Sequence, residues 1–200
     1  NGKRFQPPCR RLATPFRLDH PLPLDMLFPM TTESHKPMPP WDKSAPAESL
    51  RRLGEWYCMR ARGMFLKAGT HVEIYFLFSK DGQGTLIEVP PGMDRETFMA
   101  NLQGTIKANN TYGVIQIAEA WAYLPPKPND HIYRQVLEGE MKVSDLKPED
   151  KTEALVIRYE SSDGNQSVWV NPILRQESGV SLGEAIEIEG PALGRFGSLF

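Results

Sequence analysis

The sequence predicts an α+β fold: a mostly antiparallel sheet with two helices packed on one face, in the order α-β-β-α-β-β-β. Two segments carry apolar residues at the three- and four-residue spacing of a helix, and five carry the alternation or apolar content of strands. Turn sequences join neighbouring strands closely enough for antiparallel hairpins. Strands and helices do not alternate regularly, which argues against a doubly wound parallel sheet.

The first helix is expected to begin after Ser44 and to end at Gly69. Ser44 is a candidate N-cap, and Pro46 suits the first turn, where a backbone N–H has no helical partner. A glycine at the end of the segment allows the left-handed backbone that terminates many helices. One face of the segment carries the apolar side chains of Leu50, Leu53, Tyr57, Met64 and Phe65.

A hairpin is expected next, from a strand over residues 71–79 and a returning strand over 85–89. Alternation along the first strand places Ile74 and Phe76 on one face and the residues between them on the other. The Asp and Gly residues of segment 80–84 tolerate the positive φ angles of tight turns.

A second helix is expected over Arg95–Ala108, with Asp94 as its N-cap. Its buried face is predicted to carry Phe98, Leu102 and Ile106. The segment 112–124 that follows is apolar almost throughout, which is typical of a strand in the interior of a sheet.

A long connection rich in Pro, Asp and Lys covers residues 125–150. Strands are expected at 154–160 and 167–176, joined by a hairpin turn at 161–165, with a weaker strand at 184–189. We recognise no internal repeat. Periodicity alone predicts that the core includes Leu53, Tyr57, Phe65, Ile74, Phe76, Phe98, Leu102, Ile115, Ile117, Val156 and Val168.

Residues 1–43 are predicted to form a proline-rich extended arm, ahead of one α+β domain at 44–193 and a tail at 194–200. The arm contains nine prolines, which disfavour a helix or a central strand. It also carries many large apolar side chains, which disordered linkers usually lack. We therefore expect the arm to dock on its own domain or on another chain through Phe16, Leu24, Phe28 and Trp41.

Composition excludes several classes of protein. The net charge of −2, with both signs interspersed, argues against nucleic acid as the main partner. The two cysteines, Cys9 and Cys58, provide no disulfide framework, and Cys58 is interpreted as a small core residue. No motif predicts a metal site or a cofactor. No segment has the length of a membrane-spanning helix and no signal peptide is recognised, so a cytoplasmic location is the default expectation.

Few polar residues are candidates for chemistry. Glu119 lies in an apolar strand and must be paired, protonated or solvated there. Arg158 has a similar setting in a later strand, so the two are expected to form a cross-strand ion pair. The functional interpretation makes Glu119 a general base or ligand anchor. His131 is the best placed of the four histidines, which we interpret mainly as surface or loop residues.

These observations favour a non-enzymatic interaction or structural protein, in which the arm joins subunits of a homo-oligomer or binds another protein. The alternative is a small hydrolase-like enzyme with a site at Glu119 and His131, which requires these side chains to converge in a cleft. A nucleic-acid-binding role is supported only by the isolated arginine pairs at 10–11 and 51–52.

Overall fold

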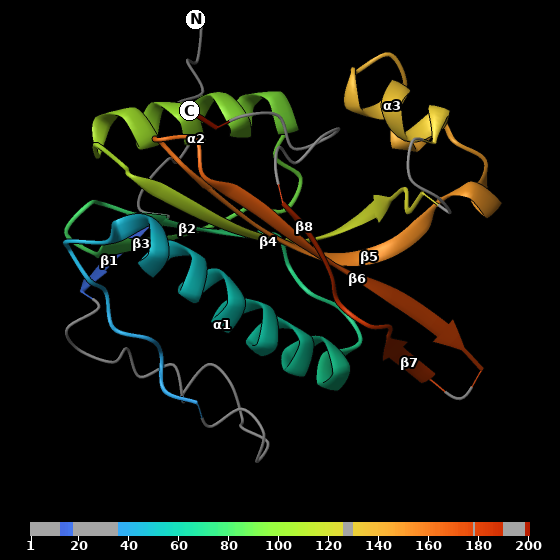
Figure 1. Ribbon diagram of the computed structural model, residues 1–200, viewed down its shortest axis with the longest axis horizontal. Helices are drawn as coiled ribbons and strands as arrows, with labels where there is room; N and C mark the ends of the chain where they lie inside the picture. Colours follow the sequence, from blue (N-terminus) through green and yellow to red (C-terminus); the bar gives the residue numbers. More distant parts are fainter. Residues whose placement is uncertain (1–12, 18–35, 126–129, 178, 190–198) are drawn as a thin grey trace, which may run out of the picture.

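The computed structural model describes residues 13–17, 36–125, 130–177, 179–189 and 199–200. These residues form one curled antiparallel sheet with helices packed on it (Figure 1). Along the sheet the strand order is β1-β3-β2-β4-β5-β6-β7, and β8 also pairs with β6. The expected α+β class, the antiparallel pairing and the order of the main elements are therefore confirmed.

The strands are β1 (Ala13–Arg17), β2 (Ile74–Phe78), β3 (Gln83–Glu88), β4 (Gly113–Ala122), β5 (Thr152–Ser161), β6 (Gln166–Gln176), β7 (Gly179–Leu182) and β8 (Ile186–Glu189). The α-helices are α1 (Pro46–Ala68), α2 (Arg95–Ala108) and α3 (His131–Leu137), and short 3₁₀ helices cover Val143–Asp145 and Pro148–Asp150.

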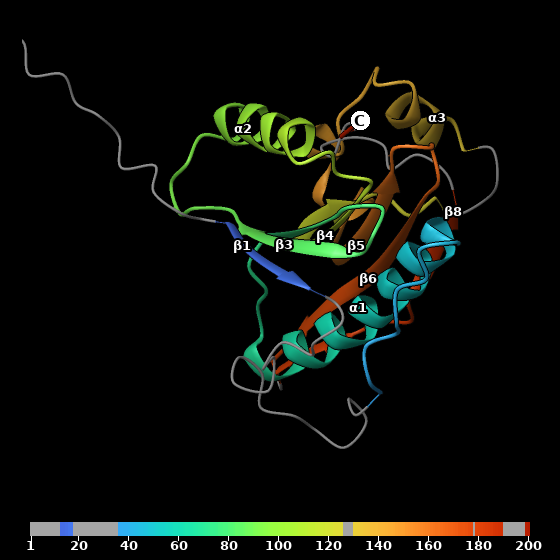
Figure 2. The ribbon, with the colours of Figure 1, turned by 90° about the vertical axis from the view of Figure 1, so that its left-hand side faces the viewer.

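Both faces of the sheet are covered, each by a different helix. α1 packs on the face that carries Phe76 and Ile115, whereas α2 packs on the face that carries Tyr75 and Val114. Figures 1 and 2 show the two helices on opposite sides of the sheet. The expectation of both helices on one face is wrong in this respect, because every residue of β2 is buried and the strand needs cover on both sides.

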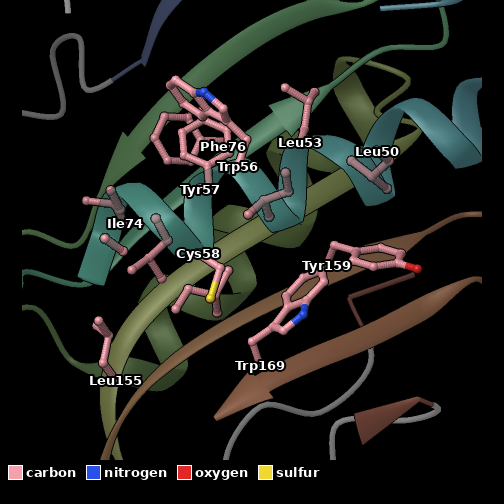
Figure 3. Close-up of a cluster of buried hydrophobic side chains, with 14 of the residues drawn as sticks. Leu50, Leu53, Trp56, Tyr57, Cys58, Ile74, Phe76, Leu155, Tyr159 and Trp169 are labelled. Carbon is pink, nitrogen blue, oxygen red and sulfur yellow. The ribbon is translucent and has the colours of Figure 1, made fainter. Parts of the chain in front are cut away.

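The larger core cluster lies between α1 and the sheet (Figure 3). Its centre is aromatic: the rings of Tyr57 and Phe76 stack with centroids 4.2 Å apart, and Trp56 meets Tyr57 edge-on at 5.0 Å. Tyr159 and Trp169, 5.8 Å apart, form the side of this cluster nearest β5 and β6. All eleven predicted core residues are buried, as their apolar spacing and alternation predict.

The ends of the helices test the capping predictions. Gly69 ends α1 in the left-handed conformation (φ 73°), and Asp94 caps α2 by accepting a hydrogen bond from Thr97 N at 2.9 Å, both as expected. The prediction for Ser44 is wrong, since Ala45 occupies the N-cap position without a side-chain hydrogen bond. Ser44 instead donates to Asp42 Oδ1 in a local turn.

Among the strands and α-helices of the described residues, three were not expected from the sequence: β1, α3 and β7. Strand β1 lies within the arm, where its Pro15 is compatible with a position at the edge of the sheet. α3 has seven residues and β7 has four, so both are too short for a periodic apolar pattern to be recognised.

Two hairpins share a turn pattern that the sequence analysis did not recognise as a repeat. Segments 79–83 and 161–165 both read Ser-x-Asp-Gly followed by an amide residue. In each, the serine Oγ accepts the backbone N–H four residues later, at 3.0 and 3.1 Å, and donates to the aspartate. Because Phe78 and Ser161 both pair with Gly113, the two turns flank the beginning of β4.

Gly54 allows α1 to lie close to the sheet, and its substitution tests this packing. A Cβ at Gly54 would lie 2.7 Å from Trp169 Cζ3, whereas a Cβ at Gly63 in the same helix would meet nothing within 4 Å. We expect Gly54→Ala to lower the free energy of unfolding by about 1–3 kcal/mol through overpacking. Gly63→Ala should raise it by about 0.5–1 kcal/mol through helix propensity alone. Urea unfolding measures both, and equal effects of the two substitutions would contradict the close approach.

Candidate functional site

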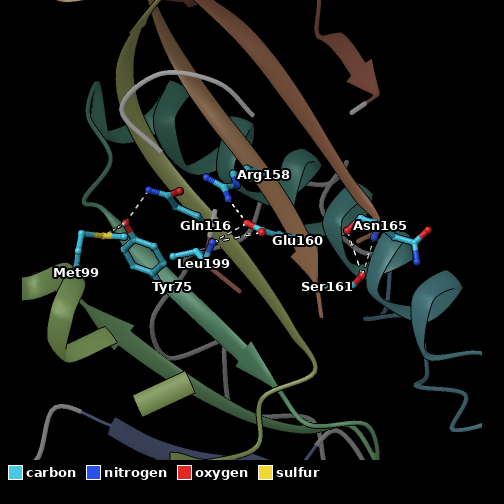
Figure 4. Close-up of polar contacts among 8 residues, drawn as sticks. All are labelled: Tyr75, Met99, Gln116, Arg158, Glu160, Ser161, Asn165 and Leu199. Atoms are coloured by element: carbon cyan, nitrogen blue, oxygen red, sulfur yellow. Dashed lines mark hydrogen bonds and ion pairs between the residues drawn. The ribbon is translucent and has the colours of Figure 1, made fainter. Parts of the chain in front are cut away.

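Two neighbouring groups of polar side chains lie on the α2 side of the sheet: hydrogen bonds join Glu73, Tyr75 and Gln116, and an ion pair joins Arg158 and Glu160. We call these five residues the polar cluster, and Figure 4 shows all of them except Glu73. Gln116 of β4 and Arg158 of β5 are Cα partners across the two strands, and they therefore point to the same face. Both are buried, so the sheet brings strongly polar groups into its interior.

The ion pair between Arg158 and Glu160 is almost fully buried. Arg158 Nη2 contacts Glu160 Oε2, and their side chains are 2% and 6% exposed. Burial lowers the pKa of Arg158, and the neighbouring Glu160 carboxylate opposes this effect. The residues are two apart on one strand, which places them on the same face. Opposite charges at this spacing in an apolar strand were the signal in the sequence for this pair.

The other members of the polar cluster, Glu73, Tyr75 and Gln116, form hydrogen bonds with one another. Gln116 Nε2 donates to Tyr75 OH and to Glu73 Oε1, both at 2.8 Å, and Tyr75 OH donates to Glu73 at 2.7 Å. Arg95, at the beginning of α2, pairs with Glu73 Oε2 at 3.1 Å. Burial, followed by the hydrogen bond to Glu73, raises the pKa of Tyr75, which keeps its hydroxyl protonated.

The expected ion pair between Glu119 and Arg158 does not form. In the register of β4 and β5, Glu119 lies opposite Leu155 and Arg158 lies opposite Gln116. Each pair thus consists of two odd-numbered or two even-numbered residues, and the side chains of a pair point to the same side of the sheet. Because 119 is odd and 158 is even, Glu119 and Arg158 point to opposite sides. The prediction is wrong because the sequence alone did not determine this register.

Glu119 is instead bound at the margin of the sheet. Its Oε1 accepts hydrogen bonds from Thr70 Oγ1 at 2.7 Å and from His71 N, and its Oε2 lies 3.6 Å from Arg175 Nη2. Glu153 also holds Arg175, at 2.6 Å. The carboxylate of Glu119 thus anchors the chain segment that leads from α1 into β2.

His71 lies in the loop between α1 and β2, and its side chain is buried. Its Nδ1 lies 2.7 Å from Val72 O, and its Nε2 is buried without a hydrogen-bond partner. Burial lowers the pKa of His71, although the contact with Val72 O and the charge of Glu119 act in the opposite direction. His71 is therefore neutral in the folded protein near pH 7.

His131 is exposed at the first position of α3. The preceding Asp130 caps this helix, accepting hydrogen bonds from Tyr133 N at 3.1 Å and Tyr123 OH at 2.8 Å. Within the described part of the chain, no hydrogen bond or ion pair joins His131 to Glu119. The two residues proposed for a hydrolase site are thus not connected.

Of the four expected anchors of the arm, Trp41 is described in full. Its ring stacks on Phe78 with centroids 5.7 Å apart, and its Nε1 donates to Lys80 O at 3.0 Å. Gly82 lies under the indole, where a Cβ would approach Trp41 Cγ to 2.6 Å. Phe16 belongs to β1, with its Cα opposite Gly84, and its side chain lies outside the described residues, as do Leu24 and Phe28 entirely.

Other kinds of site find no support in the described ranges. Among these residues, no group of three or more His, Cys, Asp or Glu is arranged to hold a metal ion. No helix within the same ranges combines the length and the apolarity needed to cross a bilayer. Cys58 is buried beside Asn171, and burial raises the pKa of its thiol, in agreement with its interpretation as a core residue.

Comparisons with protein-family models, with curated proteins and with solved structures give no match for this chain.

The buried ion pair is expected to be costly to break and less costly to replace. Arg158→Met removes the guanidinium beside buried Glu160 and should lower the free energy of unfolding by about 3–5 kcal/mol. The double change Arg158→Met, Glu160→Leu should recover part of this loss in urea unfolding. As a control, Arg51→Ala breaks exposed pairs and should cost at most about 1 kcal/mol. A double variant no more stable than the single variant would refute the expectation.

The buried, neutral His71 predicts a pH dependence of stability. Because its pKa is lower in the folded than in the unfolded chain, the unfolded chain binds a proton first as the pH falls. The free energy of unfolding should therefore decrease as the pH falls below about 6.5. His71→Gln should flatten this dependence between about pH 7.5 and about pH 5. Equal slopes for wild type and His71→Gln would contradict the prediction.

Proposed function

We propose that this chain is a non-enzymatic interaction protein that uses its N-terminal arm, residues 1–43, to dock on its own domain or on a second copy. The observation that carries the proposal is the pairing of β1 from the arm with β3 of the domain. Strand addition at a sheet edge is a general way for chains to bind one another.

The β3 edge is suited to strand addition. β3 pairs with β2 on one side, and its other side would present unpaired N–H and C=O groups if β1 were removed. β1 covers this side with five antiparallel residue pairs, from Ala13↔Ile87 to Arg17↔Gln83 (Figure 2). Backbone hydrogen bonds of this kind depend little on side-chain identity, so they fix the arm without a specific motif.

Trp41 supports the proposal from a second position. Its ring stacks on Phe78 and its N–H finds an acceptor, which is the environment in which a tryptophan acts as an anchor. The neighbouring Met38 also packs on the core, and Trp56 of α1 donates to Lys36 O at 2.9 Å. The segment 36–41 is thus held by apolar contacts and by hydrogen bonds.

The length of the intervening chain allows the arm to act within one chain or between two. Eighteen residues, 18–35, separate β1 from the segment around Trp41. A chain of this length can span up to about 60 Å when extended. The same β1–β3 contact is therefore sterically available between neighbouring copies, which would join them by strand exchange.

The hydrolase alternative has less support. Both carboxylate oxygens of Glu119 already contact Thr70, His71 or Arg175, and the exposed His131 is not joined to it. Two side chains that act together in acid–base catalysis must be in direct hydrogen-bond contact or be joined through one water molecule. A nucleic-acid-binding role is not favoured by the net charge of −2.

Light scattering and urea unfolding together test the docking of the arm. We compare the full chain, a version lacking residues 1–43, and Trp41→Ala, with Trp121→Ala at a 53% exposed position as the matched control. Docking between copies predicts that the truncated chain has fewer copies per particle than the full chain. Docking within one chain predicts an unchanged number of copies and a free energy of unfolding lowered by about 2 kcal/mol or more in both arm variants. The proposal fails if neither the number of copies nor the stability differs from that of the control.

A further inference from the structure

A second docking site lies on the opposite face of the sheet from Trp41, under α2. Leu199 is buried there, at 5% exposure, although it belongs to no helix or strand. Its side chain joins the core cluster of Tyr75, Leu77, Ile87, Phe98, Leu102, Ile106 and Val114. Phe200, the next residue, is 42% exposed.

The backbone of Leu199 is recognised by a buried charge. Leu199 N lies 3.3 Å and 3.2 Å from the two carboxylate oxygens of Glu160 (Figure 4). Glu160 is itself held in place by Arg158, which is 2% exposed. A carboxylate in a dry environment is a strong acceptor, and a backbone N–H is present in every peptide residue except proline. The apolar lining then selects the side chain.

The elements that build this pocket also contact one another without Leu199. Tyr75 lies 5.4 Å, between ring centroids, from Phe98 of α2, and Met99 Sδ lies 4.0 Å from the Tyr75 hydroxyl. The polar cluster is likewise held by its own hydrogen bonds. A pocket whose walls are supported independently can release its occupant without losing the fold.

We propose that the pocket between α2 and the sheet is a binding site for a peptide segment with a leucine-sized side chain and a free backbone N–H, and that Leu199 occupies it as a displaceable internal ligand. Glu160 accepts the N–H, Arg158 positions Glu160, and the apolar face of α2 covers the side chain. This site is independent of the arm, because Trp41 and α1 lie on the other face of the sheet.

Fluorescence anisotropy with a labelled, amidated peptide of residues 196–200 tests the site. The full chain carrying Leu199→Gly should bind the peptide at least tenfold more tightly than the wild-type chain, because the internal ligand is removed. Trp121→Ala, at a 53% exposed position outside this site, should behave as the wild type does. A peptide with Asp in place of the leucine should not bind.

Methylation of the leucine nitrogen in the peptide tests the contact with Glu160 without altering the protein. The methylated peptide should bind at least tenfold more weakly to the Leu199→Gly chain. The proposal is overturned if both peptides bind equally, or if wild type and Leu199→Gly bind equally or not at all. If Leu199→Gly does not fold, the test uses hydrogen exchange of the Leu199 amide in the wild-type chain. Excess peptide should displace Leu199 and accelerate this exchange. An unchanged exchange rate would refute the proposal.

Discussion

The need to cover both faces of the central strands determines the rest of the structure. β2 and β4 are apolar on both sides, and an exposed apolar face of this size would be unfavourable in water. α1 covers one face and α2 covers the other, although they differ in length and are joined through a hairpin. Gly54 allows the longer helix to approach Trp169, which brings β5 and β6 into the same core.

The same constraint determines where polar residues can lie. Strand residues under a helix have no access to water, so Arg158 and Gln116 need partners within the sheet and find them in Glu160, Tyr75 and Glu73. Glu119 lies where β4 leaves the cover of the helices, and it binds backbone and side chains of the segment that enters β2. Polar groups are thus concentrated between α2 and the sheet and at the margin of the sheet.

The two proposed docking sites are the β3 edge of the sheet and the space between α2 and the sheet. The arm adds β1 to the β3 edge and packs Trp41 on the α1 side, whereas Leu199 enters the α2 side and binds Glu160. Both contacts combine backbone hydrogen bonds with one large apolar side chain. Such contacts bind extended segments with modest sequence requirements, which agrees with an interaction protein that lacks a recognisable catalytic motif.

The sequence by itself determined the main elements and the core, because apolar periodicity is local: Phe76, Leu102 and Ile117 are buried as their alternation and spacing predict. It did not determine which face each helix covers, nor the partners of Glu119 and Arg158. Those depend on the register between β4 and β5, which are separated by a long connection, and a shift of one residue reverses every pairing. Glu160 and Gln116 could therefore be identified as site residues only from the tertiary structure, because burial and register decide which polar groups meet.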